Sequence, residues 1–89
     1  MVLSRNLTIT NELGLHARAA AKLVKLAEKA HGPVFVGKDG EEVDATSLLD
    51  IIGLYCPQGT EVSLRIIDPA DSDLLNEMAG LVEKGFGES

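Results

Sequence analysis

Hydrophobic and polar residues alternate along two stretches of the chain, and this alternation predicts β-strands with one buried face. In residues 2–10, one side of the extended chain is apolar and carries Leu3, Leu7 and Ile9. The other side is polar and carries Ser4, Asn6 and Thr8. Residues 60–67 show the same two sides: Val62, Leu64 and Ile66 against Glu61, Ser63 and Arg65. Between them, residues 34–36 and 41–44 predict two short strands joined at the Asp39-Gly40 pair, which is typical of a tight hairpin.

The pattern changes to a helical period over residues 17–30. Apolar residues recur there at the spacing of a buried helix stripe: Ala20, Leu23, Val24 and Ala27. At about 100° per residue, the basic residues fall in one sector opposite that stripe: Arg18, Lys22, Lys25 and Lys29. The segment His31-Gly32-Pro33 ends this predicted helix.

Two further helices are predicted. Thr46 and Ser47 begin a short one that ends near Gly53, with Asp50 three residues after Ser47 as in a capping box. Asp68 and Pro69 begin another that ends near Gly85. Its buried stripe comprises Leu74, Leu75, Met78, Leu81 and Val82.

The order of elements is therefore βαββαβα, in one domain over residues 1–89. A single sheet with its helices on one face buries all of these apolar sides with the fewest layers. The predicted fold is a two-layer α+β fold.

Composition narrows the function classes. The net charge is −6, yet residues 1–31 carry five basic and two acidic side chains, whereas residues 32–89 carry three and twelve. An acidic chain with Phe35, Tyr55 and Phe86 as its only aromatic residues is a poor candidate for nucleic-acid binding. Its basic third favours docking on an acidic protein surface.

Other features exclude further classes. Cys56 is the single cysteine, which excludes an internal disulfide and a cysteine-rich zinc site. Residues 1–10 contain no continuous apolar run, so we expect neither a signal peptide nor membrane insertion, and a cytoplasmic location. We expect no metal and no cofactor.

His16 is the strongest candidate for chemistry. It follows a Gly-Leu turn at a helix start, where free N–H groups and the positive end of the helix dipole favour an anion, and Arg18 comes two residues later. A neutral imidazole is a good nucleophile near pH 7, and these groups would hold a phosphoryl group without a metal. No carboxylate is expected beside His16, so a Ser-His-Asp hydrolase is not indicated. The alternative is that His16 is an ordinary polar residue at a helix start. His31, at the end of the same predicted helix, is expected to be a surface residue.

The short helix is unusually apolar. Asp50 is the one charge among Leu48, Leu49, Ile51, Ile52, Leu54 and Tyr55. Such a short helix cannot bury apolar groups on every side, which predicts a docking patch unless loops and the preceding helix cover it. Ser47 is a helix cap, and a regulatory phosphate is physically possible at the same place.

The motif Gly14-Leu15-His16-Ala17-Arg18 resembles the active-site signature of HPr, the histidine-containing carrier of the bacterial phosphoenolpyruvate-dependent sugar phosphotransferase system. A second stretch resembles the regulatory region of that family: Ser47-Leu48-Leu49, Leu54 and Gln58-Gly59-Thr60-Glu61-Val62. The resemblance covers essentially the whole chain. It implies an open-faced β-sandwich of four antiparallel strands with three helices on one face.

The resemblance also implies a function. Enzyme I would phosphorylate His16 on Nδ1 from phosphoenolpyruvate, and the group would pass to an enzyme IIA domain. Arg18 matches the active-site arginine, and the backbone of Ala17 and Arg18 would bind the phosphate. The chain would be a stoichiometric carrier, most simply a monomer, and not an enzyme.

The same resemblance assigns regulatory and docking residues. Ser47 matches the serine that an HPr kinase/phosphorylase modifies. Leu48, Leu49 and Ile52 match the partner-docking patch, and Lys22 and Lys25 belong to the basic helix that the family presents to acidic partners.

Three residues depart from the family pattern. Ala19 replaces a usual proline, which predicts a looser Arg18 and slower transfer. Asp50 stands where Gly or Lys is frequent, and it should repel an acidic partner and disfavour a phosphate on Ser47. Tyr55 stands where Gly is frequent, so the exit of the short helix is expected to differ.

These departures keep two alternatives open. One is a regulatory relative in a nitrogen-type or incomplete phosphotransferase pathway, with the same chemistry used for signalling. The other is an interaction module in which Ser47 is the switch and His16 is incidental. The two alternatives differ in whether His16 accepts a phosphoryl group: it does in the regulatory relative and does not need to in the interaction module.

Overall fold

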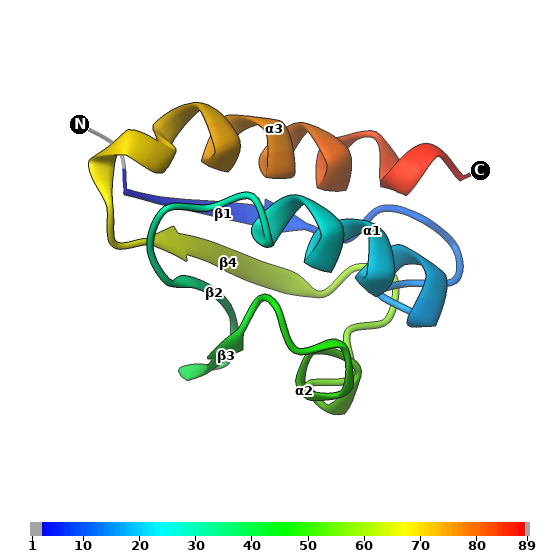
Figure 1. Ribbon diagram of the computed structural model, residues 1–89. Helices are drawn as coiled ribbons and strands as arrows, with labels where there is room; N and C mark the ends of the chain where they lie inside the picture. The colour runs from blue at the N-terminus through cyan, green and yellow to red at the C-terminus, as the bar shows by residue number, and fades with distance from the viewer. Residues whose placement is uncertain (1–2, 89) are drawn as a thin grey trace.

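A computed structural model describes residues 3–88. Four strands form one antiparallel sheet in the order β1-β4-β2-β3: β1 Ser4–Thr8, β2 Val34–Lys38, β3 Glu41–Asp44 and β4 Glu61–Ile66. Three α-helices pack on it: α1 Ala17–Ala27, α2 Leu48–Gly53 and α3 Ser72–Glu83 (Figure 1). This arrangement confirms the predicted α+β fold and its element order. Positions 1, 2 and 89 of the predicted domain lie outside the described residues.

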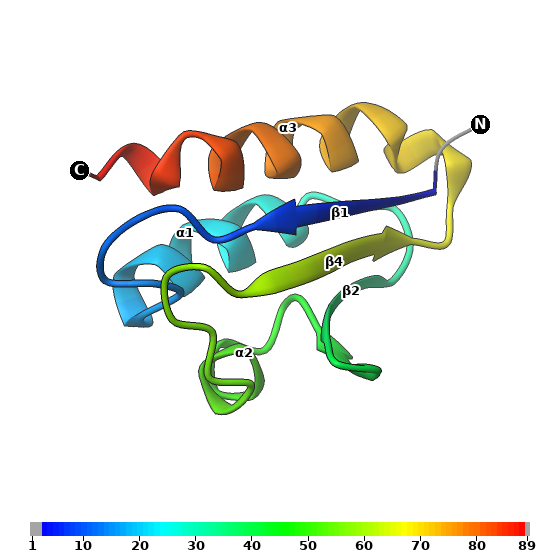
Figure 2. The ribbon, with the colours of Figure 1, turned by 180° about the vertical axis from the view of Figure 1, so that it is seen from behind.

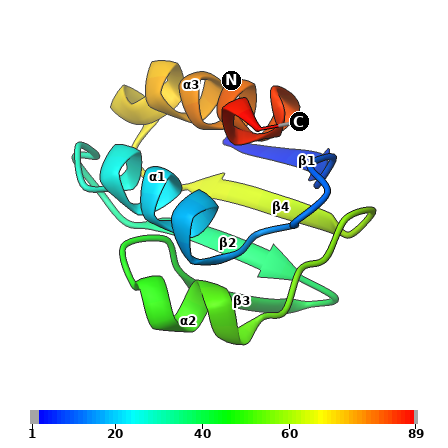
Figure 3. The same ribbon diagram turned by 90° about the vertical axis from the view of Figure 1, so that its right-hand side faces the viewer.

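The helices occupy one face of the sheet. They lie side by side in the order α3, α1, α2 (Figure 3). From behind, β1 and β4 lie in front of the helices, and no helix within residues 3–88 covers that face (Figure 2). Within residues 3–88, no helix is long and apolar enough to cross a membrane.

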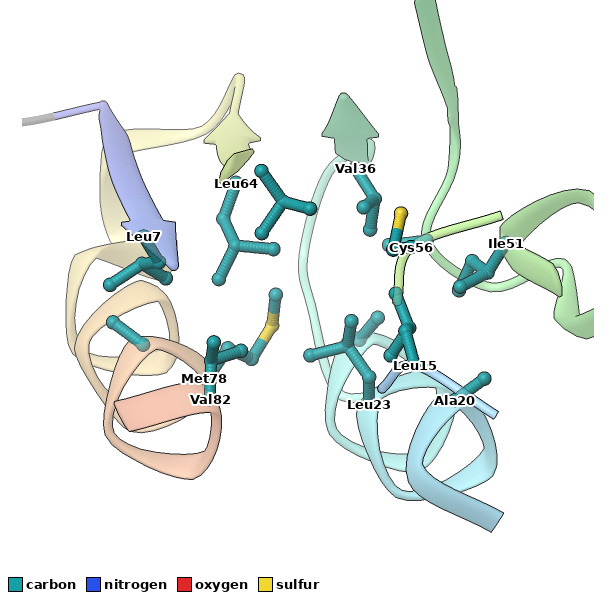
Figure 4. Close-up of a cluster of buried hydrophobic side chains, with 14 of the residues drawn as sticks. Leu7, Leu15, Ala20, Leu23, Val36, Ile51, Cys56, Leu64, Met78 and Val82 are labelled. Atoms are coloured by element: carbon teal, nitrogen blue, oxygen red, sulfur yellow. The ribbon is translucent and has the colours of Figure 1, made fainter. Parts of the chain in front are cut away.

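The core lies between the sheet and the helical layer. Leu7 and Leu64 point toward Met78 and Val82 of α3, and Val36 points into the same layer beside Cys56 (Figure 4). Burying a side chain of this size contributes about 1.5–3 kcal/mol. A second group of buried side chains joins α1, α2 and the loops beside them: Leu15, Ala20, Leu23, Ile51 and Cys56. The loops next to α1 and α2 are therefore fixed by the core itself.

The ends of the first two predicted elements differ from the sequence prediction. Leu3 is 39% exposed and precedes the strand, although its carbonyl still accepts the N–H of Ile66. Helix α1 ends at Ala27 rather than at residue 30, because Lys29 and Ala30 form tighter i→i+3 hydrogen bonds. Apolar periodicity locates a helix well but does not resolve this last tightened turn.

The third helix also begins later than predicted. Asp68 caps a short 3-10 helix, Pro69–Asp71, and the α-helix begins only at Ser72. Beyond Glu83, a second 3-10 turn, Gly85–Gly87, redirects the chain. Figure 3 shows that the C-terminal end of this segment lies on the same side of the molecule as the start of α1.

The predicted hairpin is confirmed. Asp39 and Gly40 have φ angles of +52° and +84°, as a two-residue turn with both central residues in the left-handed region requires. Val36 pairs with Val43 across it.

Candidate functional site

His16 occupies the N-cap of α1, as the sequence predicts. Its carbonyl accepts the N–H of Ala20 at 2.8 Å, which begins the helical hydrogen bonding. Its Nδ1 accepts the backbone N–H of Arg18 at 3.3 Å. The ring nitrogen therefore faces the unpaired N–H groups of the helix start, where the dipole favours negative charge.

A carboxylate lies directly against the other ring nitrogen, which corrects the prediction that none is beside His16. Glu88 Oε2 is 2.7 Å from His16 Nε2. The two side chains are 24% and 14% exposed, so the contact is partly shielded from solvent. The sequence analysis missed Glu88 because 72 residues separate it from His16.

These two contacts fix the proton on the imidazole. An ionised carboxylate only accepts hydrogen bonds, so Nε2 carries the proton that Glu88 binds. A backbone N–H only donates, so Nδ1 carries the lone pair that faces Arg18. In this tautomer the ring is neutral, and Nδ1 is the nitrogen that carries an available lone pair.

The carboxylate of Glu88 is held in place by Asn11. Asn11 Nδ2 donates to Glu88 Oε1 at 2.9 Å and to the carbonyl of Gly14 at 2.7 Å. The hydrogen bond from Asn11 lowers the pKa of Glu88 below its usual value, and the contact with His16 and the charge of Arg18 act in the same direction. Glu88 is therefore ionised near neutral pH.

The loop before His16 is fixed from the other side. Leu15 donates its N–H to the carbonyl of Cys56 at 2.8 Å. Gly14 has a φ of +70°, and a Cβ there would come within 2.6 Å of that same carbonyl oxygen and 2.8 Å of Pro57 Cα. Only glycine allows both the left-handed backbone and this close approach.

The basic residues of α1 have different surroundings. Arg18 is exposed beside the site, and its charge reaches Glu88. Lys22 donates from Nζ to the carbonyl of Phe86 at 2.6 Å, so it joins α1 to the C-terminal turn. Lys25 and Lys29 are exposed along a groove between α1 and α3.

Helix α2 exposes a substantial part of its apolar surface. Ser47 caps it, accepting the N–H of Asp50 at 3.4 Å. Ile51 is buried, Leu48 is half-buried, and Leu49 and Ile52 are 79% and 38% exposed. Loops and α1 therefore leave part of this patch open to solvent.

Asn11 and Glu88 are the two site residues that sequence reasoning did not find. Asn11 sits in a segment that indicated only a loop, although a buried asparagine before a turn often bonds to the backbone. For Glu88 the one signal is the pair Gly85 and Gly87, which flanks Phe86 and allows the chain to turn after α3. Such a turn does not specify where the following residue lies.

Known proteins resemble this chain along its whole length. A family model described as "PTS HPr component phosphorylation site" matches residues 3–84. The phosphocarrier protein HPr of Cupriavidus necator is 37% identical over 87 residues, 98% of each chain. The phosphocarrier protein NPr of Escherichia coli K12 is 30% identical over 89 residues, 99% of each chain.

The fold gives the same result. A crystal structure of HPr from Thermoanaerobacter tengcongensis superposes with a TM-score of 0.92 at 33% identity, covering 99% of both chains. With the matched family model and the full-length relatives, this likeness shows that the chain belongs to the HPr family of the phosphotransferase system.

Proposed function

We propose that this chain is a phosphocarrier that accepts a phosphoryl group on Nδ1 of His16 from enzyme I and passes it to an enzyme IIA domain. The observation that carries the proposal is the pair of contacts on the imidazole. Nε2 is bound to Glu88 at 2.7 Å, and Nδ1 faces the N-terminus of α1. The chain ends each transfer phosphorylated until a partner removes the group, so it acts as a stoichiometric carrier and not as an enzyme.

The phosphoryl transfer consists of one bond forming at Nδ1 of His16 while another breaks. The lone pair on Nδ1 forms a P–N bond while the bond between phosphorus and the donor breaks. The ring keeps its proton on Nε2 and becomes positively charged, and the carboxylate of Glu88 balances that charge. The same carboxylate keeps the ring oriented through both directions of transfer.

The phosphoryl oxygens would be bound by the start of α1. The N–H groups of Ala17 and Arg18 belong to the first turn, where they have no partner within the helix. The Arg18 N–H, which now donates to Nδ1, is released once that nitrogen is bonded to phosphorus. The exposed Arg18 guanidinium adds charge-assisted hydrogen bonds.

The proposal is tested by intact-mass spectrometry after incubation with enzyme I and phosphoenolpyruvate. One phosphoryl group should be gained, it should be lost in acid, and a His16→Ala variant should gain none. A variant with Ser47→Ala should gain the group as the parent does, because Ser47 is not the acceptor in this reaction. No gain with a cognate enzyme I would overturn the proposal and favour the interaction module.

The surface around the site supports docking of protein partners. Leu48, Leu49 and Ile52 present apolar area on α2, and Lys25 offers positive charge on α1. Lys22 contributes less, because its ammonium group is bound to the carbonyl of Phe86.

Asp50 is exposed in the same surface, so an Asp50→Lys variant should be phosphorylated faster by an acidic enzyme I. An unchanged rate would remove Asp50 from the docking account.

Ser47 is the proposed target of an HPr kinase/phosphorylase. Its Oγ caps α2 and is half-buried, and a phosphate at a helix N-terminus is stabilised by the dipole. The carboxylate of Asp50 in the same turn opposes the added charge. We therefore expect such a kinase, supplied with ATP, to phosphorylate Ser47 more slowly in the parent chain than in an Asp50→Asn variant.

A nitrogen-type regulatory role is the second candidate, and the similarity to the NPr of Escherichia coli favours it. Phosphoryl transfer from the phosphorylated chain to a sugar-type and to a nitrogen-type IIA domain separates the two. Faster transfer to the sugar-type domain supports uptake, and the reverse supports regulation.

A cytoplasmic monomer fits both roles, because a carrier must present one site to successive partners. One relative from Thermoanaerobacter tengcongensis is described as an HPr dimer. Sedimentation of this chain at the concentrations used for transfer tests the expected monomer.

A further inference from the structure

Tyr55 adopts a backbone conformation that opposes its own side chain. It follows Leu54, the C-cap of α2, and has a φ of +56°. This is the left-handed position after a helix, which glycine usually occupies because a Cβ clashes there with the neighbouring backbone. The exit from the helix thus keeps the geometry suited to glycine while carrying a large aromatic residue.

Packing in the core does not explain why a large aromatic residue occupies position 55. Tyr55 is 73% exposed, whereas its neighbours Leu54 and Cys56 are buried. Lys38 donates from Nζ to the carbonyls of Leu54 at 3.1 Å and Tyr55 at 2.5 Å, and the ammonium group lies 5.5 Å from the centre of the ring. Lys38 thus holds the turn through its backbone carbonyls, which any residue at position 55 would supply.

The ring extends the apolar surface of α2. Leu49, Ile52 and Tyr55 follow one another at three-residue spacing, and all three are exposed. Leu49 and Ile52, three positions apart within α2, share one side of the helix, and Tyr55 follows them in the left-handed position just beyond its end. The Tyr55 N–H donates to the carbonyl of Ile52 at 3.1 Å, which keeps the last residue of this row against the helix.

The same row is joined directly to the candidate site. Tyr55 precedes Cys56, whose carbonyl accepts the N–H of Leu15 at 2.8 Å, and Leu15 precedes His16. A stable protein interface buries about 800 Å² on each partner. An interface of that size around His16 extends over neighbouring segments, and the loop that begins at Tyr55 is bonded directly to the residue before His16.

We propose that Tyr55 is a specificity-determining anchor for enzyme I, the protein that transfers the phosphoryl group to His16, and that it fits an apolar pocket on that partner. Exposed aromatic rings that become buried at the centre of an interface contribute strongly to binding. The inference rests on the proposed function, and it adds a residue that the pattern of the site motif does not contain.

The test compares phosphorylation by enzyme I and phosphoenolpyruvate over a range of chain concentrations for the parent and for Tyr55→Gly. The variant should raise KM by about tenfold, the loss typical of one interface anchor, while kcat stays within about twofold. Its thermal unfolding midpoint should equal or exceed that of the parent, because glycine suits the positive φ.

Two further variants complete the experiment. Tyr55→Phe keeps the ring and should keep the KM of the parent. Ile67→Ala removes an exposed apolar side chain at the opposite end of β4 from the loop that contacts Leu15, and it should leave KM unchanged.

The outcomes that overturn the inference differ from the one that overturns the proposed function. Equal KM values for the parent and Tyr55→Gly, or a lower unfolding midpoint for the variant, would mean that Tyr55 is not an anchor. A parent chain that enzyme I does not phosphorylate would instead overturn the proposed function, and this inference with it.

Discussion

At the scale of single residues, the contact between His16 Nε2 and Glu88 leaves Nδ1 as the imidazole nitrogen that we propose accepts the phosphoryl group. Without it, both tautomers of a neutral histidine are available in water, and either nitrogen can attack. The hydrogen bond from Asn11, together with His16 and Arg18, lowers the pKa of Glu88, so its carboxylate stays ionised further into the acid range than an ordinary glutamate. Glu88, 72 residues beyond His16 in sequence, therefore combines with His16 and the nearby Asn11 to fix one proton.

Replacing Glu88 by glutamine tests this effect. Glu88→Gln retains a hydrogen-bond acceptor but loses the charge that, in the proposed function, balances the phosphorylated ring. The rate of phosphorylation by enzyme I should fall by about tenfold, equivalent to about 1.4 kcal/mol in the transition state. Single-turnover transfer measured by rapid quench gives this rate. Glu28→Gln removes the same charge at the opposite end of α1 and serves as the control; equal rates for both variants would exclude an electrostatic role for Glu88.

Ala19 permits a second test at this scale. It is the third residue of α1, where the N–H has no acceptor within the helix, so proline is compatible with the backbone. Ala19→Pro should restrict the start of the helix and the backbone of Arg18. We expect phosphoryl transfer to become about twofold to fivefold faster. This corresponds to an activation free energy lower by about 0.4–1 kcal/mol, because less backbone flexibility is lost on reaching the transition state. Transfer at the parent rate would show that Arg18 is already held well enough.

At the scale of elements, Asp71 joins α3 to the loop after α1. Its carboxylate is 2% exposed and accepts the N–H groups of His31 at 2.8 Å and Gly32 at 3.0 Å. His31 Nδ1 lies 2.9 Å from the same carboxylate, while its side chain is 70% exposed. His31, an expected surface residue, therefore helps to hold two helices in position.

This contact predicts a stability maximum with two limits. The backbone N–H of His31 lowers the pKa of Asp71 from its ordinary 3.8, so this stabilisation is present above that value and is lost as pH falls through the lowered pKa. The hydrogen bond to Asp71 raises the pKa of His31 from 6.5, so the ion pair's stabilisation is complete below 6.5 and is lost as pH rises through the raised pKa. Urea unfolding at a series of pH values measures both limits.

A His31→Gln variant identifies the group responsible. It should remove the decline in stability on the alkaline side and retain the decline on the acid side, since Asp71 keeps its two backbone hydrogen bonds. An unaltered alkaline decline would assign that loss to another group.

The loop that precedes α1 gives a further prediction at this scale. Gly14→Ala places a Cβ against the carbonyl of Cys56 in a left-handed backbone, and it should destabilise the fold by about 1–3 kcal/mol. Gly40→Ala is the matched control, because φ is +84° there but no atom lies within 4 Å of a Cβ. Urea unfolding should show a larger loss for Gly14. Equal losses would mean that only φ matters and that the loop yields to the added methyl group.

At the scale of the whole molecule, local patterns predicted the elements and their order. Period identifies β1, β4, α1 and α3. The Asp39-Gly40 turn was needed for β2 and β3, and the cap at Ser47 for α2. The start of α3 was less predictable, because Asp68 and Pro69 are equally compatible with a 3-10 turn and with an α-helix. Local patterns determine elements but not the tightness of their first turn.

The candidate site was predictable only where it is local in sequence. His16, Arg18 and the helix start lie within a few residues, so their relation follows from a helical N-terminus. Asn11 and Glu88 meet across 77 residues of chain, and that contact depends on how α3 packs and where the turn after it points. Only the assembled fold contains this information.

The central claim is that His16 reacts through Nδ1, and nitrogen-15 NMR of the histidine rings tests it most directly. In the free chain, the ring should show a protonated Nε2 and an unprotonated Nδ1. After phosphorylation by enzyme I and phosphoenolpyruvate, coupling to phosphorus should appear on Nδ1 of His16. Coupling on Nε2, or on His31, or no coupling after complete reaction with enzyme I, would contradict the account.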